Sequence, residues 1–381
     1  MTWYENTDGL GNFSNSNIIS DSAYFVKCVY ACDIDGDTDI DILSGNQQDS
    51  IIAWYENDGS GNFISQHNIT DLASYVQSVY AIDIDGDYDL DVISCGNNKI
   101  VWFKNTDGYG SYSNQNYIID TLNAPISIYA IDFDNDSDID IVSASYGDSL
   151  VYWFENIDGY GNFSPINIIS DTVFNAMAVY ACDMDSDGDN DVISASVDII
   201  FHENDGLGNF NQHDIISPTM LGGQSVYACD MDDDGDNDVI SAELSALMYH
   251  QNNLGSFNTQ FIATAGVDGL FSVYASDLDG DGDNDVLCAS MGSISWFKNL
   301  GLNSIEQIDN SNIDIYPNPI IDYAYLSAKN IVRYEIFNQI GEVIASVEDN
   351  NSIDLSDKPT GIYHIKIVLE NQIVVKKLLK Q

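Results

Sequence analysis

Basic side chains are scarce in this chain. Its 381 residues include 11 Lys and Arg against 61 Asp and Glu, which gives a formal net charge of −50 at pH 7. Residues 1–301 hold only four of the basic residues, namely Lys27, Lys99, Lys104 and Lys298. Because a surface this acidic repels polyanions, we exclude nucleic acid and anionic membranes as partners and regard uronic-acid polymers as disfavoured ligands.

Long apolar runs are lacking as well. No stretch reaches the roughly 18 apolar residues of a membrane-spanning helix, so we predict no transmembrane segment. Met1–Asn6 has neither the basic start nor the apolar run of a signal peptide. Because the chain also begins inside a repeat, at Trp3, we expect an N-terminal truncation that removed the signal peptide.

The six cysteines do not form a disulfide framework. Cys28 and Cys32 lie four positions apart on one expected strand, about 13 Å, which is too far to bridge. Cys32, Cys182 and Cys229 share one repeat position, which predicts small buried side chains there and not reactive thiols.

Catalytic motifs are also missing. The sequence contains no Gly-x-Ser-x-Gly elbow, no phosphate-binding loop and no His-Glu-x-x-His. His202 and His250 stand where other repeats carry Tyr or Phe, so we interpret both as packing residues. We therefore predict that the chain is not an enzyme.

Six acidic loops dominate what is present. Each reads Asp-x-Asp-x-Asp-x-Asp-x-Asp, numbered here as positions 1 to 9, and successive loops start 47 to 51 residues apart. Two carboxylates about 4–5 Å apart repel by roughly 3–4 kcal/mol at an effective dielectric of about 20, so such loops need a cation. Ligands that are all oxygen select a hard ion, and calcium tolerates an irregular cage better than magnesium does.

We therefore predict up to six bound calcium ions as the cofactor. The predicted metal-binding residues are the five aspartates of each loop: Asp33, Asp35, Asp37, Asp39 and Asp41; Asp83, Asp85, Asp87, Asp89 and Asp91; Asp132, Asp134, Asp136, Asp138 and Asp140; Asp183, Asp185, Asp187, Asp189 and Asp191; Asp230, Asp232, Asp234, Asp236 and Asp238; Asp277, Asp279, Asp281, Asp283 and Asp285.

Four short β-branched and aromatic runs occupy each repeat. In the second repeat they are Val79–Ala81 before the loop, Asp91–Ser94 after it, the aromatic run Trp102–Asn105, and a fourth run beyond a Gly-rich turn. Four strands in just under fifty residues predict the blade of an all-β propeller. The copies fit seven blades with the first lacking its inner two strands, or six blades in which Phe13–Ile19 supplies the outer strand of the last sheet.

The acidic loops and their flanking strands resemble the FG-GAP/VCBS repeats of integrin α-subunit propellers and bacterial surface proteins, over residues 1 to about 301. The resemblance implies side-chain ligands at positions 1, 3, 5 and 9 and a main-chain carbonyl at position 7. That family usually has Gly at position 6. The last three loops have Gly there, whereas Thr38, Tyr88 and Ser137 depart from the pattern, so we expect the first three sites to be weaker.

The composition changes after Gly301. We predict a polar linker at 302–312 and a small immunoglobulin-like β-sandwich at 313–381, because apolar residues alternate between turns there. In order, the motifs are Tyr316-Pro317-Asn318-Pro319, Gly341-Glu342, Gly361-Ile362-Tyr363 and Lys376-Lys377. They resemble the type A sorting domain of the type IX secretion system. The resemblance implies the secretion machinery as a partner and a secreted or cell-surface location.

Together these features predict a secreted, cell-surface calcium-binding propeller that acts as an adhesion or ligand-binding module for an unknown extracellular glycan or protein. The alternatives are the propeller of a polysaccharide-active enzyme, lyase or hydrolase, and a passive structural module of a surface layer. The recurring Tyr and Trp residues are interpreted as packing residues. A ligand surface is expected where the copies differ, at Gly45–Ser50, Ser145–Ser149 and Pro218–Gln224.

Overall fold

The computed structural model describes residues 1–217, 222–244, 246–263, 269–299, 305–307, 315–316, 318–327, 331–337, 343–348, 350–369 and 373–380. Every helix or strand assigned within these ranges is a β-strand. Accordingly, the described part of the chain has no helix that is long and apolar enough to cross a membrane.

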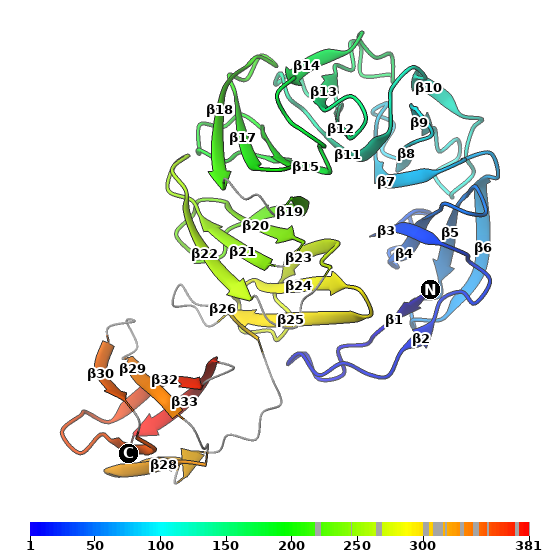
Figure 1. Ribbon diagram of the computed structural model, residues 1–381. Helices are drawn as coiled ribbons and strands as arrows, with labels where there is room; N and C mark the ends of the chain where they lie inside the picture. The colour runs from blue at the N-terminus through cyan, green and yellow to red at the C-terminus, as the bar shows by residue number, and fades with distance from the viewer. Residues whose placement is uncertain are drawn as a thin grey trace.

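Six four-stranded antiparallel sheets are arranged in a ring among the described residues, which confirms the predicted propeller (Figure 1). Sequence neighbours pair within each sheet, so each repeat forms one blade. The blades are β3 (Val26–Cys32), β4 (Asp41–Asn46), β5 (Ile51–Asn57) and β6 (Phe63–Thr70); β7 (Val76–Ile82), β8 (Asp91–Gly96), β9 (Lys99–Phe103) and β10 (Asn116–Ile119); β11 (Pro125–Ile131), β12 (Asp140–Ser145), β13 (Leu150–Phe154) and β14 (Asn167–Ser170); β15 (Ala178–Cys182), β16 (Asp191–Ala195), β17 (Ile199–Asn204) and β18 (Phe210–Ser217); β19 (Gly223–Cys229), β20 (Asp238–Glu243), β21 (Ala246–Gln251) and β22 (Asn258–Ala263); and β23 (Ser272–Ser276), β24 (Asp285–Ser290), β25 (Ser293–Asn299) and β26 (Ile305–Gln307).

A two-stranded sheet at the N-terminus makes a seventh, partial blade. It consists of β1 (Thr2–Trp3) and β2 (Asn17–Ile18), which correspond to the third and fourth strands of the other repeats. The seven-blade alternative with an incomplete first blade is therefore the correct one. The six-blade alternative is wrong, because the fourth strand of the last sheet is β26, which pairs with β25, and not Phe13–Ile19.

Strand β26 also corrects the predicted linker. Residues 305–307 lie inside the segment 302–312 that we expected to be linker, yet they pair with Phe297–Asn299. The reason is that this pairing uses backbone groups, which the polar side-chain sequence does not reveal. The rest of the predicted linker lies outside the described residues.

The partial blade closes the ring between the last blade and the first complete one (Figure 1). Gly11 lies so close to Trp296 of the last blade that an added Cβ would stand 2.4 Å from the Trp296 ring, and Gly61 lies against Trp3 in the same way. The turn glycines Gly110, Gly161 and Gly208 meet the tryptophan of the preceding blade likewise. Each turn thus packs on its neighbour around the ring.

The inner strands hold the ring together with a ladder of tyrosines. Rings of successive blades lie 4.6–5.1 Å apart, centroid to centroid, along Tyr30, Tyr80, Tyr129, Tyr180, Tyr227 and Tyr274. Trp54, Trp102 and Trp153 are buried between blades. These contacts show that the recurring aromatic residues pack against one another and between blades.

All six cysteines are free thiols.

The C-terminal part contains two sheets that share one core. One sheet is β27 (Ile315–Tyr316), β28 (Tyr323–Leu326) and β31 (Ser352–Asp354); the other is β30 (Val343–Glu348), β29 (Ile331–Phe337), β32 (Gly361–Leu369) and β33 (Ile373–Lys380). Leu326 and Ile353 of the first sheet are buried in one cluster with Tyr334 and Ile365 of the second. The described residues therefore form a β-sandwich, while the closer likeness to immunoglobulin domains stays a prediction.

Candidate metal centres

Each acidic loop joins the first strand of a blade to the second and has the same local fold. The carboxylate at position 1 accepts the main-chain N–H of position 6 at 2.8–3.1 Å in all six loops. This turn requires a positive φ at position 6. Thr38, Tyr88 and Ser137 adopt it at φ 78°, 71° and 78°, so the first three loops keep the turn without glycine, at a cost in backbone strain of order 1 kcal/mol each.

The aspartate at position 9 binds two main-chain N–H groups in every loop and so fixes the fold of the loop. Its side chain is completely buried, and its two oxygens accept main-chain N–H groups from position 2 and from the Asn that recurs at or just beyond the end of the third strand. In the third loop these donors are Phe133 at 2.9 Å and Asn156 at 2.8 Å. Burial raises the pKa of these carboxyl groups, to about 8 for Asp140, about 7 for Asp91 and Asp191, and about 6 for Asp41, Asp238 and Asp285.

The carboxylates at position 7 turn away from their own loops toward neighbouring segments. Asp189 accepts a hydrogen bond of 2.7 Å from the side chain of Asn135 in the preceding loop, and Asp138 lies against the turn glycine Gly159. For position 7 the family resemblance implies that the main-chain carbonyl is the ligand.

The remaining aspartates converge in a way that fits a hard cation. Ligand oxygens lie within 4.8 Å of one another in the groups Asp33, Asp35 and Asp41; Asp83, Asp85 and Asp91; Asp132, Asp134 and Asp136; Asp183, Asp185 and Asp191; and Asp230, Asp232 and Asp234. In the third, fourth and fifth loops one buried oxygen of the position-1 carboxylate, on Asp132, Asp183 and Asp230, accepts no hydrogen bond within the described structure. A buried carboxylate oxygen without a donor is costly, and a calcium ion would supply its missing partner.

The residue directly before the recurring Asn contacts loop carboxylates in the second, fifth and sixth loops, and the sequence analysis missed it. It is Glu56, Glu155 or Glu203 in the first, third and fourth loops, Gln251 in the fifth, and Lys104 or Lys298 in the second and sixth. In the first loop the Glu56 carboxylate instead accepts a hydrogen bond of 2.6 Å from Ser65 Oγ. Burial, followed by the neighbouring charges of Asp136 and Glu155, raises the pKa of Asp134 to about 6. The available signal was the residue after the aromatic pair, which is Glu in three of the six blades, Lys in two and Gln in one.

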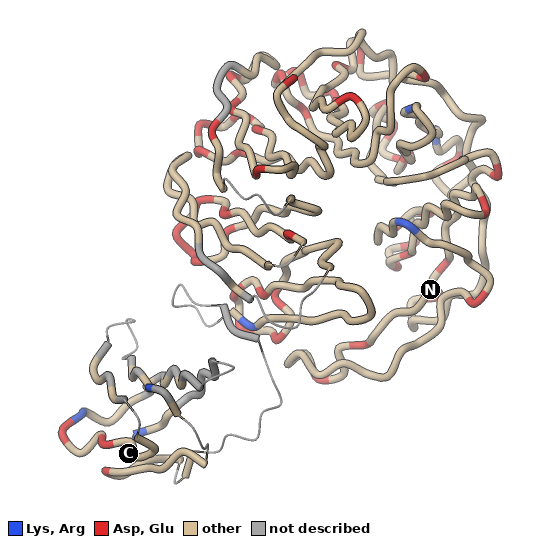
Figure 2. The backbone as a smooth tube through the Cα atoms, in the orientation of Figure 1, with Lys and Arg blue, Asp and Glu red and all other residues tan. Residues whose placement is uncertain are grey.

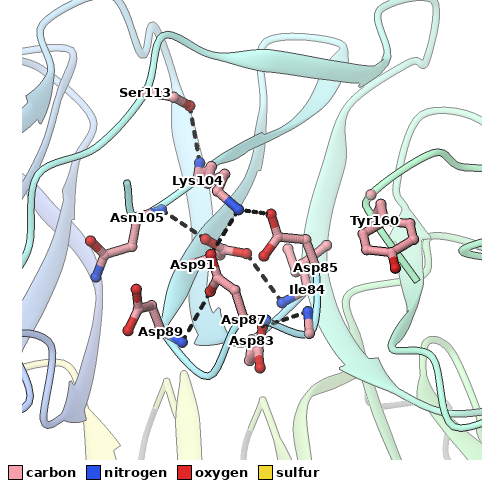
Figure 3. A network of polar contacts seen from close by, with 12 residues as sticks. Asp83, Ile84, Asp85, Asp87, Asp89, Asp91, Lys104, Asn105, Ser113 and Tyr160 are labelled. Atoms are coloured by element: carbon pink, nitrogen blue, oxygen red, sulfur yellow. Dashed lines mark hydrogen bonds and ion pairs between the residues drawn. The ribbon is translucent and has the colours of Figure 1, made fainter. Parts of the chain in front are cut away.

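The two lysines change the electrostatics of their loops. Lys104 Nζ contacts Asp85 Oδ2 and lies 2.7 Å from Asp87 Oδ2 (Figure 3), and Lys298 makes the same pair of contacts with Asp279 and Asp281. Burial alone would raise the pKa of Asp87 and of Asp281, but the lysine hydrogen bonds outweigh it and the pKa of each is lowered.

The two repeat histidines serve packing, as predicted. His202 and His250 are buried, and the Nε2 of each lies 2.8–2.9 Å from a serine Oγ on the adjacent second strand, Ser194 and Ser241.

The opposite face of the ring carries exposed aromatic side chains. Antiparallel order places the segments that link blades, together with the turns between second and third strands, at the end of the blades away from the acidic loops. Phe25, Tyr75, Phe174 and Phe271 stand in such linking segments and are 52–72% exposed. Two of the predicted variable segments, Gly45–Ser50 and Ser145–Ser149, lie at the same end, whereas residues 218–221 of the third lie outside the described residues.

The repeat geometry agrees with a comparison against protein-family models. A model described as the FG-GAP-like repeat matches residues 33–94, 83–143 and 132–194, each match starting at position 1 of an acidic loop. The chain carries FG-GAP-like repeats. A model described as the secretion system C-terminal sorting domain matches residues 314–381, so the chain also has the signal of type IX secretion, which points to a secreted or cell-surface location.

A comparison with solved structures supports the propeller fold through a match to a lectin. This lectin of Agrocybe aegerita, whose structure is described as the basis of specific recognition of non-reducing terminal N-acetylglucosamine, is 18% identical to this chain. The match covers 74% of this chain and 79% of the lectin, with a TM-score of 0.57, and it establishes the fold alone. The V. cholerae biofilm matrix protein Bap1 is 16% identical, and the match covers 79% of this chain and 58% of Bap1 with a TM-score of 0.37. A chain of the nidogen/laminin complex is 12% identical, and the match covers 66% of this chain and 88% of that chain with a TM-score of 0.45. No curated protein matches.

The sorting domain uses its first motif to hold the C-terminal strand. Asn318 Oδ1 accepts the main-chain N–H of Leu379 at 2.9 Å, and Ile320 donates its N–H to the carbonyl of Leu379 at 2.6 Å. Lys380 is buried and its Nζ lies 3.2 Å from Asp322 Oδ1. The Gly341-Glu342 motif and the side chains of Lys376 and Lys377 lie outside the described residues.

Proposed function

We propose that this FG-GAP propeller is a secreted, surface-displayed calcium-binding module that binds an extracellular glycan or protein. Calcium would be held in the acidic loops by the carboxylates at positions 1, 3, 5 and 9. Once bound, the ions supply the positive charge that lets these loops stay ordered. The sorting domain would deliver the propeller to the cell surface, where extracellular calcium is at levels that loops of modest affinity can use.

The observation that carries the binding role is the set of exposed aromatic side chains on the face opposite the loops. Phe25, Tyr75, Phe174 and Phe271 come from different blades, occupy linking segments that differ in sequence between repeats, and leave more than half of each side chain in solvent. Exposed aromatic residues in loops on a rigid scaffold are typical of ligand-binding surfaces. The sparse basic charge over the whole ring (Figure 2) favours neutral glycans or basic protein surfaces as ligands.

Binding of the full chain to a glycan array and to extracellular matrix proteins, in calcium, tests this proposal. Replacing Phe25, Tyr75, Phe174 and Phe271 together by Ala is expected to abolish the interaction. The matched control replaces Tyr109 and Tyr160, which are 76% and 73% exposed but stand in turns at the acidic-loop end. Binding that survives the first variant, or is lost in the second, would place the ligand elsewhere. Release of shortened sugars during the assay would favour the enzymatic alternative instead.

A further inference from the structure

The six complete blades differ in the residue that directly follows the aromatic pair. It is Glu in the first, third and fourth blades, Lys in the second and sixth, and Gln in the fifth, and the Lys and Gln side chains contact the acidic loops. The Gln251 amide lies 2.6 Å from Asp232 Oδ2, so this position reaches the position-3 carboxylate. The identity of one residue per blade therefore sets the charge at each candidate centre.

In the second loop the lysine occupies the oxygens that a metal would need. Lys104 Nζ contacts Asp85 Oδ2 and lies 2.7 Å from Asp87 Oδ2, and these are positions 3 and 5 (Figure 3). Asp85 is only 8% exposed, so its charge requires a partner. The ammonium group of Lys104 is the partner of Asp85 Oδ2, whereas Asp85 Oδ1 is buried and accepts no hydrogen bond within the described structure.

The sixth loop repeats the arrangement with independent residues. Lys298 Nζ contacts Asp279 Oδ2, lies 2.7 Å from Asp281 Oδ2, and comes from the same position of its blade. Asp279 is buried to the same degree as Asp85. The same lysine–aspartate contacts thus occur in two blades that lie four blades apart in the sequence. We therefore attribute them to the lysine at this repeat position and not to the surroundings of one loop.

A lysine at this point opposes calcium binding, although Asp83, Asp85 and Asp91 converge beside it. The ion needs six to eight oxygen ligands at about 2.3–2.6 Å, whereas an ammonium group has three donors and no acceptor. It therefore removes two carboxylate oxygens from the cage and repels the cation from the same spot.

We infer that Lys104 and Lys298 neutralise the second and sixth loops from within, so that these two loops take no calcium and the ring binds four ions, at the first, third, fourth and fifth loops. This inference rests on the proposed calcium binding. It reverses the ranking expected from glycine at position 6: the sixth loop has Gly282 and binds no ion, whereas the first and third have Thr38 and Ser137 and do.

Equilibrium dialysis of the full chain against radioactive calcium, in about 0.15 M salt to screen surface charge, counts the ions. Wild-type protein is expected to bind four. Lys104→Glu and Lys298→Glu give these loops the side chain of the first, third and fourth, and each is expected to add one ion, with six in the double variant. Lys104→Gln reproduces the fifth loop and is expected to give five, which keeps the test usable if a Glu variant does not fold.

Two kinds of control variant separate an effect at the loops from a general effect of net charge. Lys27→Glu and Lys99→Glu change the net charge equally but lie away from the loops (Lys99 Nζ is 3.4 Å from Gln115 Oε1), so the count should stay at four. The reverse change, Glu155→Lys, should lower it to three. Six ions on wild-type protein, or an unchanged count in both lysine variants, would overturn the inference and leave calcium binding intact. A count of zero on wild-type protein would instead remove the calcium proposal on which it rests.

Discussion

The side-chain amide of Asn6 donates a hydrogen bond of 2.6 Å to the main-chain carbonyl of Leu278, 272 positions further along the chain. The equivalent Asn of each blade from the second complete blade onward makes the same bond to the preceding blade, as Asn252 does to Met184 at 2.5 Å. Asn6 therefore joins the partial first blade to the last blade by the same Asn-to-carbonyl hydrogen bond that links neighbouring complete blades. With Gly11 against Trp296, this contact closes the ring.

Gly11→Ala is predicted to weaken that closure. The new methyl group would meet the Trp296 ring, so we expect a loss of about 1–3 kcal/mol in the free energy of unfolding, measured by chemical denaturation in calcium. Gly9→Ala is the matched control: Gly9 also has a positive φ, 68° against 77°, but no atom lies within 4 Å of its added Cβ. Equal losses in the two variants would show that backbone strain alone, and not the contact with Trp296, is responsible.

The buried aspartate at position 9 is predicted to stabilise the folded protein both with and without bound metal. In Asp140→Asn the amide offers one acceptor oxygen to two main-chain donors, Phe133 and Asn156, and leaves one buried N–H unsatisfied. We expect the free energy of unfolding to fall by about 1–3 kcal/mol, both in calcium and in chelator. Asp138→Asn, at position 7, makes the same chemical change at a partly exposed side chain and should stay within about 0.5 kcal/mol. A loss for Asp140→Asn that disappears in chelator would mean that the residue acts through the metal only.

His250 is predicted to make stability depend on pH. Burial lowers its pKa to about 3 in the folded protein, so below a pH of about 6.5 the unfolded chain takes up a proton that the folded chain does not. Stability is therefore present above that pH and is lost as the pH falls. Between pH 7 and pH 5 wild-type protein should lose about 2 kcal/mol more than His250→Gln, which can still bond Ser241 and Thr259. Parallel pH curves for the two proteins, measured in saturating calcium, would contradict this.

Most of the fold followed from the period of the repeat. The run Val79–Ala81, the acidic loop and Trp102–Asn105 recur with fixed spacing, so the four strands of a blade could be predicted, whereas the sequence left the blade count open between seven and six. The outer strand of the last blade could not, because Ile305–Gln307 is held by backbone pairing that a polar sequence hides. Ring closure through Trp296 also required the structure, since the contact spans nearly three hundred residues.

The candidate centres were predicted less completely than the fold. Alternating aspartates pointed to a hard cation, and the resemblance implied which positions carry ligands. Lys104 and Lys298 were recorded only as two of the few basic residues, because nothing in a linear sequence shows that a third-strand side chain reaches a loop that begins 21 residues earlier. The distinction between the loops therefore comes from geometry.

Thermal unfolding of the full chain in millimolar calcium and in excess chelator tests the central claim most directly. A site at about 100 times its dissociation constant contributes roughly 2.7 kcal/mol, so several sites together should raise Tm by upwards of about 10 °C. The account predicts that increase, together with its loss on chelation and its recovery when calcium is restored. Identical melting curves in calcium and in chelator would contradict it.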